Sequence, residues 1–214
     1  MKYYDFGLAP NPRRVNVFIN EKALKIETLE INLRAGEQFA EAFLKVNPLA
    51  TVPCLELDDG SVIVETMAIC RYLEALHPSP CLFGSNPRDI AAIEQWSRRA
   101  ELEGFLSVAD ALRNGNPQFA NRAVPGRRDY VQIPALAQRG KARCQSFFED
   151  LDRRLTGREF VATASFSAAD INAYITVEFA GRVGVKPTNA MADLQRWYQA
   201  LAERPAVQAL PAAP

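Results

Sequence analysis

The sequence has little histidine, no closely paired cysteines and no excess of either charge. A single histidine, His77, and four scattered cysteines without a Cys-x-x-Cys pair exclude a zinc cluster and a disulfide framework. Lys and Arg together number 25, as do Asp and Glu, so the basic excess typical of nucleic-acid binders is missing. No apolar run reaches the ~18–20 residues of a membrane span, and residues 1–6 lack the apolar core of a signal peptide. We therefore expect a globular cytoplasmic protein with free thiols, which binds no metal, nucleic acid or membrane.

The first 80 residues alternate between strand and helix patterns. Strand patterns cover 2–6, 26–31, 52–57 and 61–64, and helical patterns cover 13–22, 38–45 and 65–76. Asp58-Asp59-Gly60 predicts a hairpin between the last two strands, because glycine adopts the positive φ of a tight reversal at little cost. A strand–helix–strand crossover gives a parallel pair, to which the hairpin adds antiparallel strands. This order predicts a thioredoxin-like α/β domain over residues 1–79.

The rest of the chain has no strand pattern. Residues 80–87 contain proline, glycine and serine and predict a linker. Long helical patterns then cover about 88–113, 134–155, 168–182 and 190–203, with a loop at 114–133. Ser167 and Asp170 predict a helix-capping box, with Phe166 packing on Ile171. We expect an all-helical domain over 88–214.

Four segments together resemble the cytosolic glutathione transferases. They are APNPRRV at 9–15, NPLATVPCL at 47–55, ETMAICRYL at 65–73 and FSAADI at 166–171. Their order and spacing match that family over nearly the full chain, and the bacterial and fungal nu-type branch, which uses an Asn near the first helix, looks most similar. The resemblance implies the glutathione transferase fold, a role in detoxification, and a homodimer in which the α/β domain of one chain meets the helices of the other.

Two motifs are expected to bind glutathione. By itself Val52-Pro53 is more simply the start of an edge strand, but in the family this proline is cis and the residue before it pairs with the cysteinyl backbone of glutathione. Glu65-Thr66 alone is an ordinary helix N-terminus. The same free N–H groups, with a hydroxyl and a carboxylate, suit the zwitterionic γ-glutamyl end, and in the family this pair binds it.

The position that activates the glutathione thiol departs from the family pattern. Ala9 stands where many members have Ser or Cys, and Phe6 stands roughly where others have Tyr. Asn11 is the remaining polar candidate, either as a donor to the thiolate or merely as the N-cap before Pro12. The backbone N–H groups at the start of this helix are expected to lower the thiol pKa as well. Arg13 and Arg14 are candidates for additional positive potential.

A second departure concerns the glycyl carboxylate of glutathione. Ala50-Thr51 stands where many relatives have a Lys or His that contacts this group. Gln38, Arg13 or Arg34 are the candidate substitutes. Because a Gln near this position lies beside the ligand in the Asn-type branch, the resemblance assigns Gln38 to the glutathione site.

The acceptor substrate is expected between the helical domain and the 9–11 loop. Candidate lining residues, each of which could equally belong to the core or a loop, are Phe105, Asn114, Phe119 and Tyr130. We interpret Trp96 and Trp197 as packing or dimer residues.

Two functional hypotheses follow. The first is an enzyme that adds the glutathione thiolate to small hydrophobic electrophiles, or uses it to reduce peroxides or disulfides. The second is a non-catalytic glutathione-transferase-like binding or interaction protein, which the absence of a hydroxyl at Ala9 favours. Isomerase and dehalogenase branches usually keep Ser or Cys at that position and are discounted.

Overall fold

The structure is a computed structural model that describes residues 1–212. Its N-terminal domain is built on a four-stranded mixed sheet in the order β2-β1-β3-β4. The strands are β1 (Lys2–Asp5), β2 (Glu27–Glu30), β3 (Cys54–Glu56) and β4 (Val62–Val64). β1 and β2 are parallel, whereas β3 is antiparallel to both β1 and β4. This is the predicted thioredoxin-like order, with the predicted hairpin turning at Gly60, whose φ is 82°.

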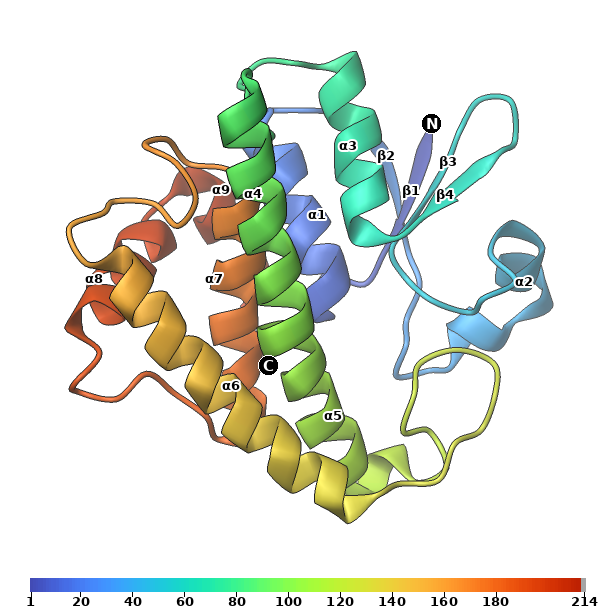
Figure 1. Cartoon of the computed structure of the whole chain (residues 1–214). Coiled ribbons are helices and arrows are strands. Elements are labelled where there is room, and N and C mark those ends of the chain that lie inside the picture. Colours follow the sequence, from blue (N-terminus) through green and yellow to red (C-terminus); the bar gives the residue numbers. More distant parts are fainter. Residues whose placement is uncertain (213–214) are drawn as a thin grey trace.

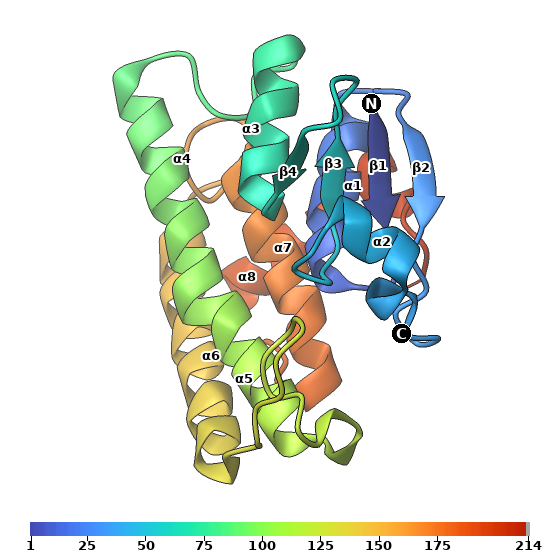
Figure 2. The same ribbon diagram turned by 90° about the vertical axis from the view of Figure 1, so that its right-hand side faces the viewer.

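Helices cover both faces of this sheet. α1 (Pro10–Glu21) and α3 (Thr66–Leu76) lie on the face towards the helical domain, and α2 (Glu41–Val46), preceded by the short turn η1 (Glu37–Phe39), lies on the other (Figures 1 and 2). Adjacent strand residues therefore enter different cores. Tyr3 packs in the large core shared with the helical domain, and Tyr4 packs in a small core with Phe43 under α2.

The C-terminal domain is entirely helical over the residues that the structure describes. α4 (Pro87–Arg99), the π-helical segment η2 (Ala100–Phe105) and α5 (Leu106–Gly115) form one long run, which α6 (Pro134–Leu155) packs against (Figure 1). α7 (Ala168–Ala180) lies in the centre, and α8 (Ala192–Ala202) and α9 (Pro205–Gln208) follow it. Two short turns, η3 (Pro117–Phe119) and η4 (Gly181–Val183), complete the elements. Residues 213 and 214 of the predicted helical domain lie outside the described part.

Several predicted boundaries were wrong for identifiable reasons. The first helix begins at residue 10 instead of 13, because Pro10 and Pro12 fit a first helical turn whose N–H groups have no intrahelical partner. The strand predicted at 52–57 shortens to 54–56, since Pro53 has no N–H for the ladder. The pattern at 88–113 did not reveal the π-helical segment, and the short α9 was not predicted.

Candidate functional site

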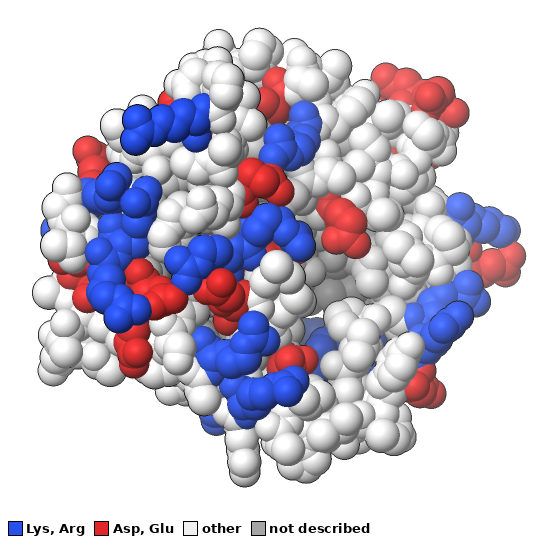
Figure 3. Space-filling view, viewed as in Figure 1, with Lys and Arg blue, Asp and Glu red and all other residues white. Residues whose placement is uncertain are grey.

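Four segments of the N-terminal domain meet at one edge of the sheet. Tyr4 of β1 pairs with Cys54 at the start of β3, and Cys54 pairs with Val64 at the end of β4. β2 runs parallel to β1 and ends at the same edge. The loop into α1, the residues before β3, the start of α3 and the η1 segment therefore converge there. The face in Figure 3 is hollowed between this part of the N-terminal domain and the α4–α5 side of the helical domain.

Helix α1 begins with a single free backbone donor. Its N-cap is Ala9, whose N–H is used in the preceding turn, and the N–H of Arg13 donates to the Ala9 carbonyl at 3.1 Å. Pro10 and Pro12 have no N–H. The N–H of Asn11 is therefore the one donor of this turn without a partner among residues 1–212. A helix N-terminus carries partial positive charge, so an anion beside Ala9 is favoured.

The side chain of Asn11 is held by Arg14. The N-cap alternative for Asn11 was wrong, because Ala9 occupies that position and Asn11 stands inside the first turn. Nη2 of Arg14 donates to Oδ1 of Asn11, and no hydrogen bond within residues 1–212 uses the Asn11 NH₂ group. The amide oxygen is thereby fixed, and the amide NH₂ remains available as a donor.

Arg14 itself is a buried cation without a carboxylate partner. Its side chain is only 3% exposed, its Nη1 donates to Oδ1 of Asn172 at 3.3 Å, and its guanidinium lies 4.1 Å from the centre of the Phe105 ring. No ion pair within residues 1–212 includes Arg14, and its Nε has no hydrogen-bond partner there. Burial lowers the pKa of Arg14 to about 10, which leaves it charged at neutral pH. An uncompensated buried charge is costly, so the site favours an anion nearby.

The start of α3 offers a second set of free donors. The first intrahelical bond runs from the N–H of Ile69 to the carbonyl of Glu65 at 3.0 Å, and the N–H groups of Thr66, Met67 and Ala68 have no partner among residues 1–212. Glu65 has φ 74° and ψ 123°, a conformation that costs a non-glycine residue ~1–3 kcal/mol and that concentrates at functional sites. Thr66 is buried and Glu65 is exposed, so this helix end presents N–H groups, a hydroxyl and a carboxylate.

The predicted peptide-binding edge is also at this end of the sheet. The Val52–Pro53 bond is cis, as the resemblance implied. Neither the N–H nor the carbonyl of Val52 has a hydrogen-bond partner among residues 1–212, so both can pair with an extended ligand. Gln38 lies in η1, is only 3% exposed, and its Oε1 is buried without a partner.

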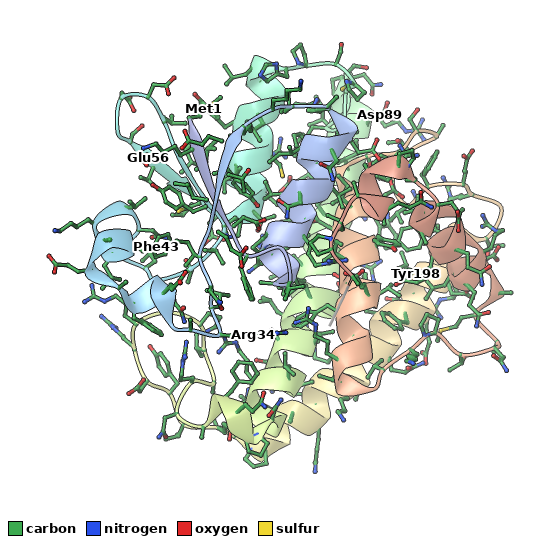
Figure 4. The ribbon with its side chains drawn as sticks, turned by 180° about the vertical axis from the view of Figure 1, so that it is seen from behind. Met1, Arg34, Phe43, Glu56, Asp89 and Tyr198 are labelled. Atoms are coloured by element: carbon green, nitrogen blue, oxygen red, sulfur yellow. The ribbon has the colours of Figure 1, made fainter. Side chains whose placement is uncertain are left out.

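The two arginines considered for the glycyl carboxylate lie in different environments. Arg13 is buried and makes two 2.7 Å bonds to the carboxylate of Glu178, with a further bond to the carbonyl of Pro211 at 2.6 Å. It therefore joins α1 to α7 and to the C-terminal segment. Arg34 is exposed and lies at the lower edge of the N-terminal domain when seen from behind (Figure 4). Burial lowers the pKa of Arg182, and the charges of Arg13 and Arg34 lower it further.

The acceptor-site candidates have mixed positions. Phe105 packs in the core against Phe179, and Asn114 is buried with its Oδ1 accepting the N–H of Ile133 at 2.9 Å. Phe119 lies under the guanidinium of Arg113. Of the four candidates, Tyr130 on the loop after α5 has the most exposed side chain, at 45%. Trp96 and Trp197 are both buried in the core, which agrees with the interpretation that they are packing residues.

The sequence suggested Arg14 only as a source of positive electrostatic potential, and its hydrogen bond to the side chain of Asn11 was not predicted. A spacing of three residues in a helix brings the two side chains to one face, which is the signal that was available. Within residues 1–212, no cluster of three His, Cys, Asp or Glu side chains is arranged to hold a metal. In the same range, no helix is both long and apolar enough to cross a membrane.

Comparison with known proteins supplies the family. The family model "Glutathione S-transferase, N-terminal domain" matches residues 9–76, and "Glutathione S-transferase, C-terminal domain" matches 130–205. Glutathione S-transferase 2 of Saccharomyces cerevisiae is 34% identical over 98% of this chain and 89% of its own. Glutathione S-transferase GstB of Escherichia coli is 30% identical over 92% and 91%.

The solved structures agree with these relatives. The crystal structure of Gtt2 from Saccharomyces cerevisiae superposes with a TM-score of 0.88 at 32% identity, covering 97% of this chain and 99% of that one. A Sulfitobacter homologue solved with bound glutathione shares the fold, with a TM-score of 0.80 at 19% identity. The narrower resemblance to the nu-type branch stays a prediction. The two domain models, the full-length relatives and the fold agree that the chain belongs to the glutathione S-transferase family.

Proposed function

We propose that this protein is a glutathione transferase that binds the tripeptide across the edge of the sheet where α1, β3 and α3 meet. The observation that carries the proposal is the convergence of unused polar groups there. The free backbone of Val52, the free N–H groups at the start of α3 and the free N–H of Asn11 belong to three separate segments. Each suits a different part of an extended peptide thiol: its backbone, its γ-glutamyl carboxylate and its sulfur.

Binding of the γ-glutamyl end is assigned to Glu65 and Thr66. The N–H groups and the hydroxyl of Thr66 donate to the carboxylate, and the Glu65 carboxylate pairs with the ammonium group. Glu65 is the N-cap residue of α3, but its side chain makes no capping hydrogen bond and is exposed. The carboxylate is therefore available for a ligand, and the strained backbone of Glu65 also favours a binding role.

Activation of the thiol is assigned to the start of α1. A free thiol has a pKa of ~8.5 and reacts as the thiolate. The NH₂ and N–H of Asn11 donate to the sulfur, while buried Arg14 holds the amide and adds positive potential. The thiolate then attacks an electrophilic carbon, whose leaving group departs with the bonding electrons. With a peroxide or a disulfide it attacks one oxygen or one sulfur, and the O–O or S–S bond breaks as an alkoxide or a thiolate leaves with the electron pair. The acceptor is proposed to be small and hydrophobic, and the reaction needs no metal.

Assembly and location belong to the same proposal. We expect a homodimer, as the family resemblance implies, working in the reducing cytoplasm. All four cysteines are free thiols, which fits that compartment.

The test is an ultraviolet thiolate difference spectrum of bound glutathione across a pH series, with activity measured in parallel. We expect Asn11→Ala to raise the pKa of the bound thiol by about one unit and to lower kcat/KM about tenfold, the loss of one donor to a charged group. Asn11→Asp should lower activity further, because a carboxylate beside Arg14 neutralises it and repels the thiolate. Asn20→Ala, in the last turns of the same helix, is the control.

The outcomes separate the hypotheses. If the wild-type protein does not bind glutathione, the proposed function is wrong. If it binds glutathione but shows neither a thiolate signal nor turnover of any electrophile, peroxide or disulfide, the binding-protein alternative replaces the enzyme. An unchanged thiol pKa in both Asn11 variants contradicts the assigned mechanism alone.

A further inference from the structure

The loop between α5 and α6 (residues 116–133) crosses from the helical domain to the N-terminal domain. Figures 1 and 2 show it extending from the ends of these helices to the side of the sheet that carries α2. It contacts two separate segments there. The guanidinium of Arg122 lies 4.8 Å from the centre of the Phe39 ring in η1, and a Cβ on Gly126 would lie 3.5 Å from the carbonyl oxygen of Leu49. These two segments are the ones that carry Gln38 and, after Leu49, Val52-Pro53.

The loop has a defined internal structure. The N–H of Ala123 donates to the carbonyl of Tyr130 at 3.0 Å, and the N–H of Tyr130 donates to the carbonyl of Asn121 at 2.8 Å. Arg113 of α5 donates to the carbonyl of Arg122 at 2.5 Å. Arg122 is therefore held on a braced segment, which reduces the entropy lost when it binds a ligand.

Arg113 and Arg122 form a pair of like charges without an acid. The ion pairs within residues 1–212 include neither of them. Burial, together with the charge of Arg122, lowers the pKa of Arg113 to about 10. The Arg113 guanidinium is engaged with the Phe119 ring and the Arg122 carbonyl, whereas that of Arg122 donates no hydrogen bond within the same residues. Arg122 is the member of the pair left for an anion.

The segments of the N-terminal domain that face this loop carry few groups able to bind an anion. Ala50-Thr51 supplies no cation to this segment, and the carbonyl of Thr51 already accepts a bond from Asn47 at 2.8 Å. Beside Phe39, the buried Gln38 keeps an unpartnered Oε1. The N-terminal domain therefore offers the Gln38 amide here, and its candidate cation for a carboxylate is the exposed Arg34.

We propose that Arg122, reaching across from the helical domain, binds the terminal carboxylate of the peptide ligand at its glycyl end, beside Gln38. The inference rests on the proposed function, and it makes the glycyl subsite a product of both domains. An arginine fork suits a planar carboxylate, and its stacking on Phe39 keeps it in place. The site consequently selects thiol peptides that end in a carboxylate over the same peptides with a neutral end.

The test compares two ligands on matched variants by isothermal titration calorimetry. The ligands are glutathione and its glycinamide analogue, which differ only in the charge of the terminal group. We expect the wild-type protein to bind glutathione at least tenfold more tightly than the amide, as a charge-assisted hydrogen bond provides. Arg122→Met should bind both ligands about equally, and Arg122→Lys should keep part of the preference. Arg122→Gln is the second neutral variant if Arg122→Met does not fold.

Two controls separate charge from structure. Arg127→Met removes an exposed arginine from the same loop and should keep the wild-type preference, and Arg34→Met tests the rival cation of the N-terminal domain. The proposal is overturned if Arg122→Met still prefers glutathione, if it loses affinity for both ligands by the same factor, or if only Arg34→Met abolishes the preference. Absence of glutathione binding to the wild-type protein would instead refute the proposed function.

Discussion

The four cysteines differ in how far each thiol lies from water. Cys54, Cys70 and Cys144 are buried, and burial raises the pKa of each to about 12. Cys81 is exposed in the linker between α3 and α4. Since the thiolate is the reactive form, the three buried thiols are inert in the folded protein and take no part in the proposed chemistry.

This difference predicts selective alkylation. Iodoacetamide at neutral pH should label the native protein once, at Cys81, and label all four cysteines after denaturation, as measured by peptide mass spectrometry. Cys81→Ser should leave the native protein unlabelled. Labelling of Cys54 or Cys70 at the rate of Cys81 would show that the N-terminal core opens far more readily than its burial indicates.

At the same scale, single residues show how far the site was predictable. Val52-Pro53 and Glu65-Thr66 alone predict only the start of a strand and the start of a helix, and the family resemblance of their motifs assigned them to the glutathione site. The free NH₂ of Asn11 depends on Arg14, which in turn is placed by Asn172 of α7. The role of Arg122 depends on a ring in the other domain. A partner so distant in sequence leaves no local pattern.

Among the elements, α7 begins at a capping box built on one buried carboxylate, that of Asp170. Asp170 is fully buried and its carboxylate accepts bonds from the N–H of Val161 at 2.8 Å, the N–H of Ser167 at 3.1 Å and the indole of Trp197 at 3.2 Å. This confirms the return bond of the predicted capping box. Desolvation still outweighs these bonds and raises the pKa of Asp170 to about 6.

The raised pKa gives a pH dependence of definite sign. Between the ordinary pKa of ~3.9 and about 6, the folded protein holds a proton on Asp170 that the unfolded chain has lost, so raising the pH lowers the free energy of unfolding. We expect the stability of the wild-type protein relative to Asp170→Asn to fall from pH 4 to pH 6 and to be level above pH 7. Urea unfolding followed by circular dichroism measures it.

A surface variant provides the comparison. Asp129→Asn changes an exposed carboxylate in the α5–α6 loop and should show no trend across the same pH range. A relative stability of the wild-type protein that is constant or rises between pH 4 and pH 6 would contradict the raised pKa of Asp170.

For the whole molecule, the two domains share one core. Tyr3, Val15 and Leu55 of the α/β domain belong to the same cluster as Phe147 and Trp197 of the helical domain. The ion pair of the buried Arg13 with the half-buried Glu178 adds a connection between α1 and α7. Neither domain keeps a complete core without the other, so we expect them to unfold together.

Calorimetry tests this expectation. The wild-type protein should unfold in one transition whose calorimetric and van't Hoff enthalpies agree. Glu178→Ala leaves the buried guanidinium of Arg13 without its carboxylate partner. It should lower the free energy of unfolding by about 3 kcal/mol while the protein still unfolds in one transition. Glu94→Ala removes the exposed partner of Arg71 and should cost less than ~1 kcal/mol. Two separate transitions in Glu178→Ala would show domains that fold independently.

The sequence by itself determined the order of the elements, the thioredoxin-like sheet and the helical character of the second half. Each of these follows from a local period of two or 3.6 residues and from breakers such as Asp59-Gly60, which act over a few neighbouring positions. The family and the cis proline segment followed from short motifs. The tertiary structure alone decided that Arg13 joins the domains, that Arg14 orients Asn11, and that the loop after α5 brings Arg122 to the sheet edge. These are contacts between segments far apart in the chain, and their energy depends on burial and distance, which no local pattern records.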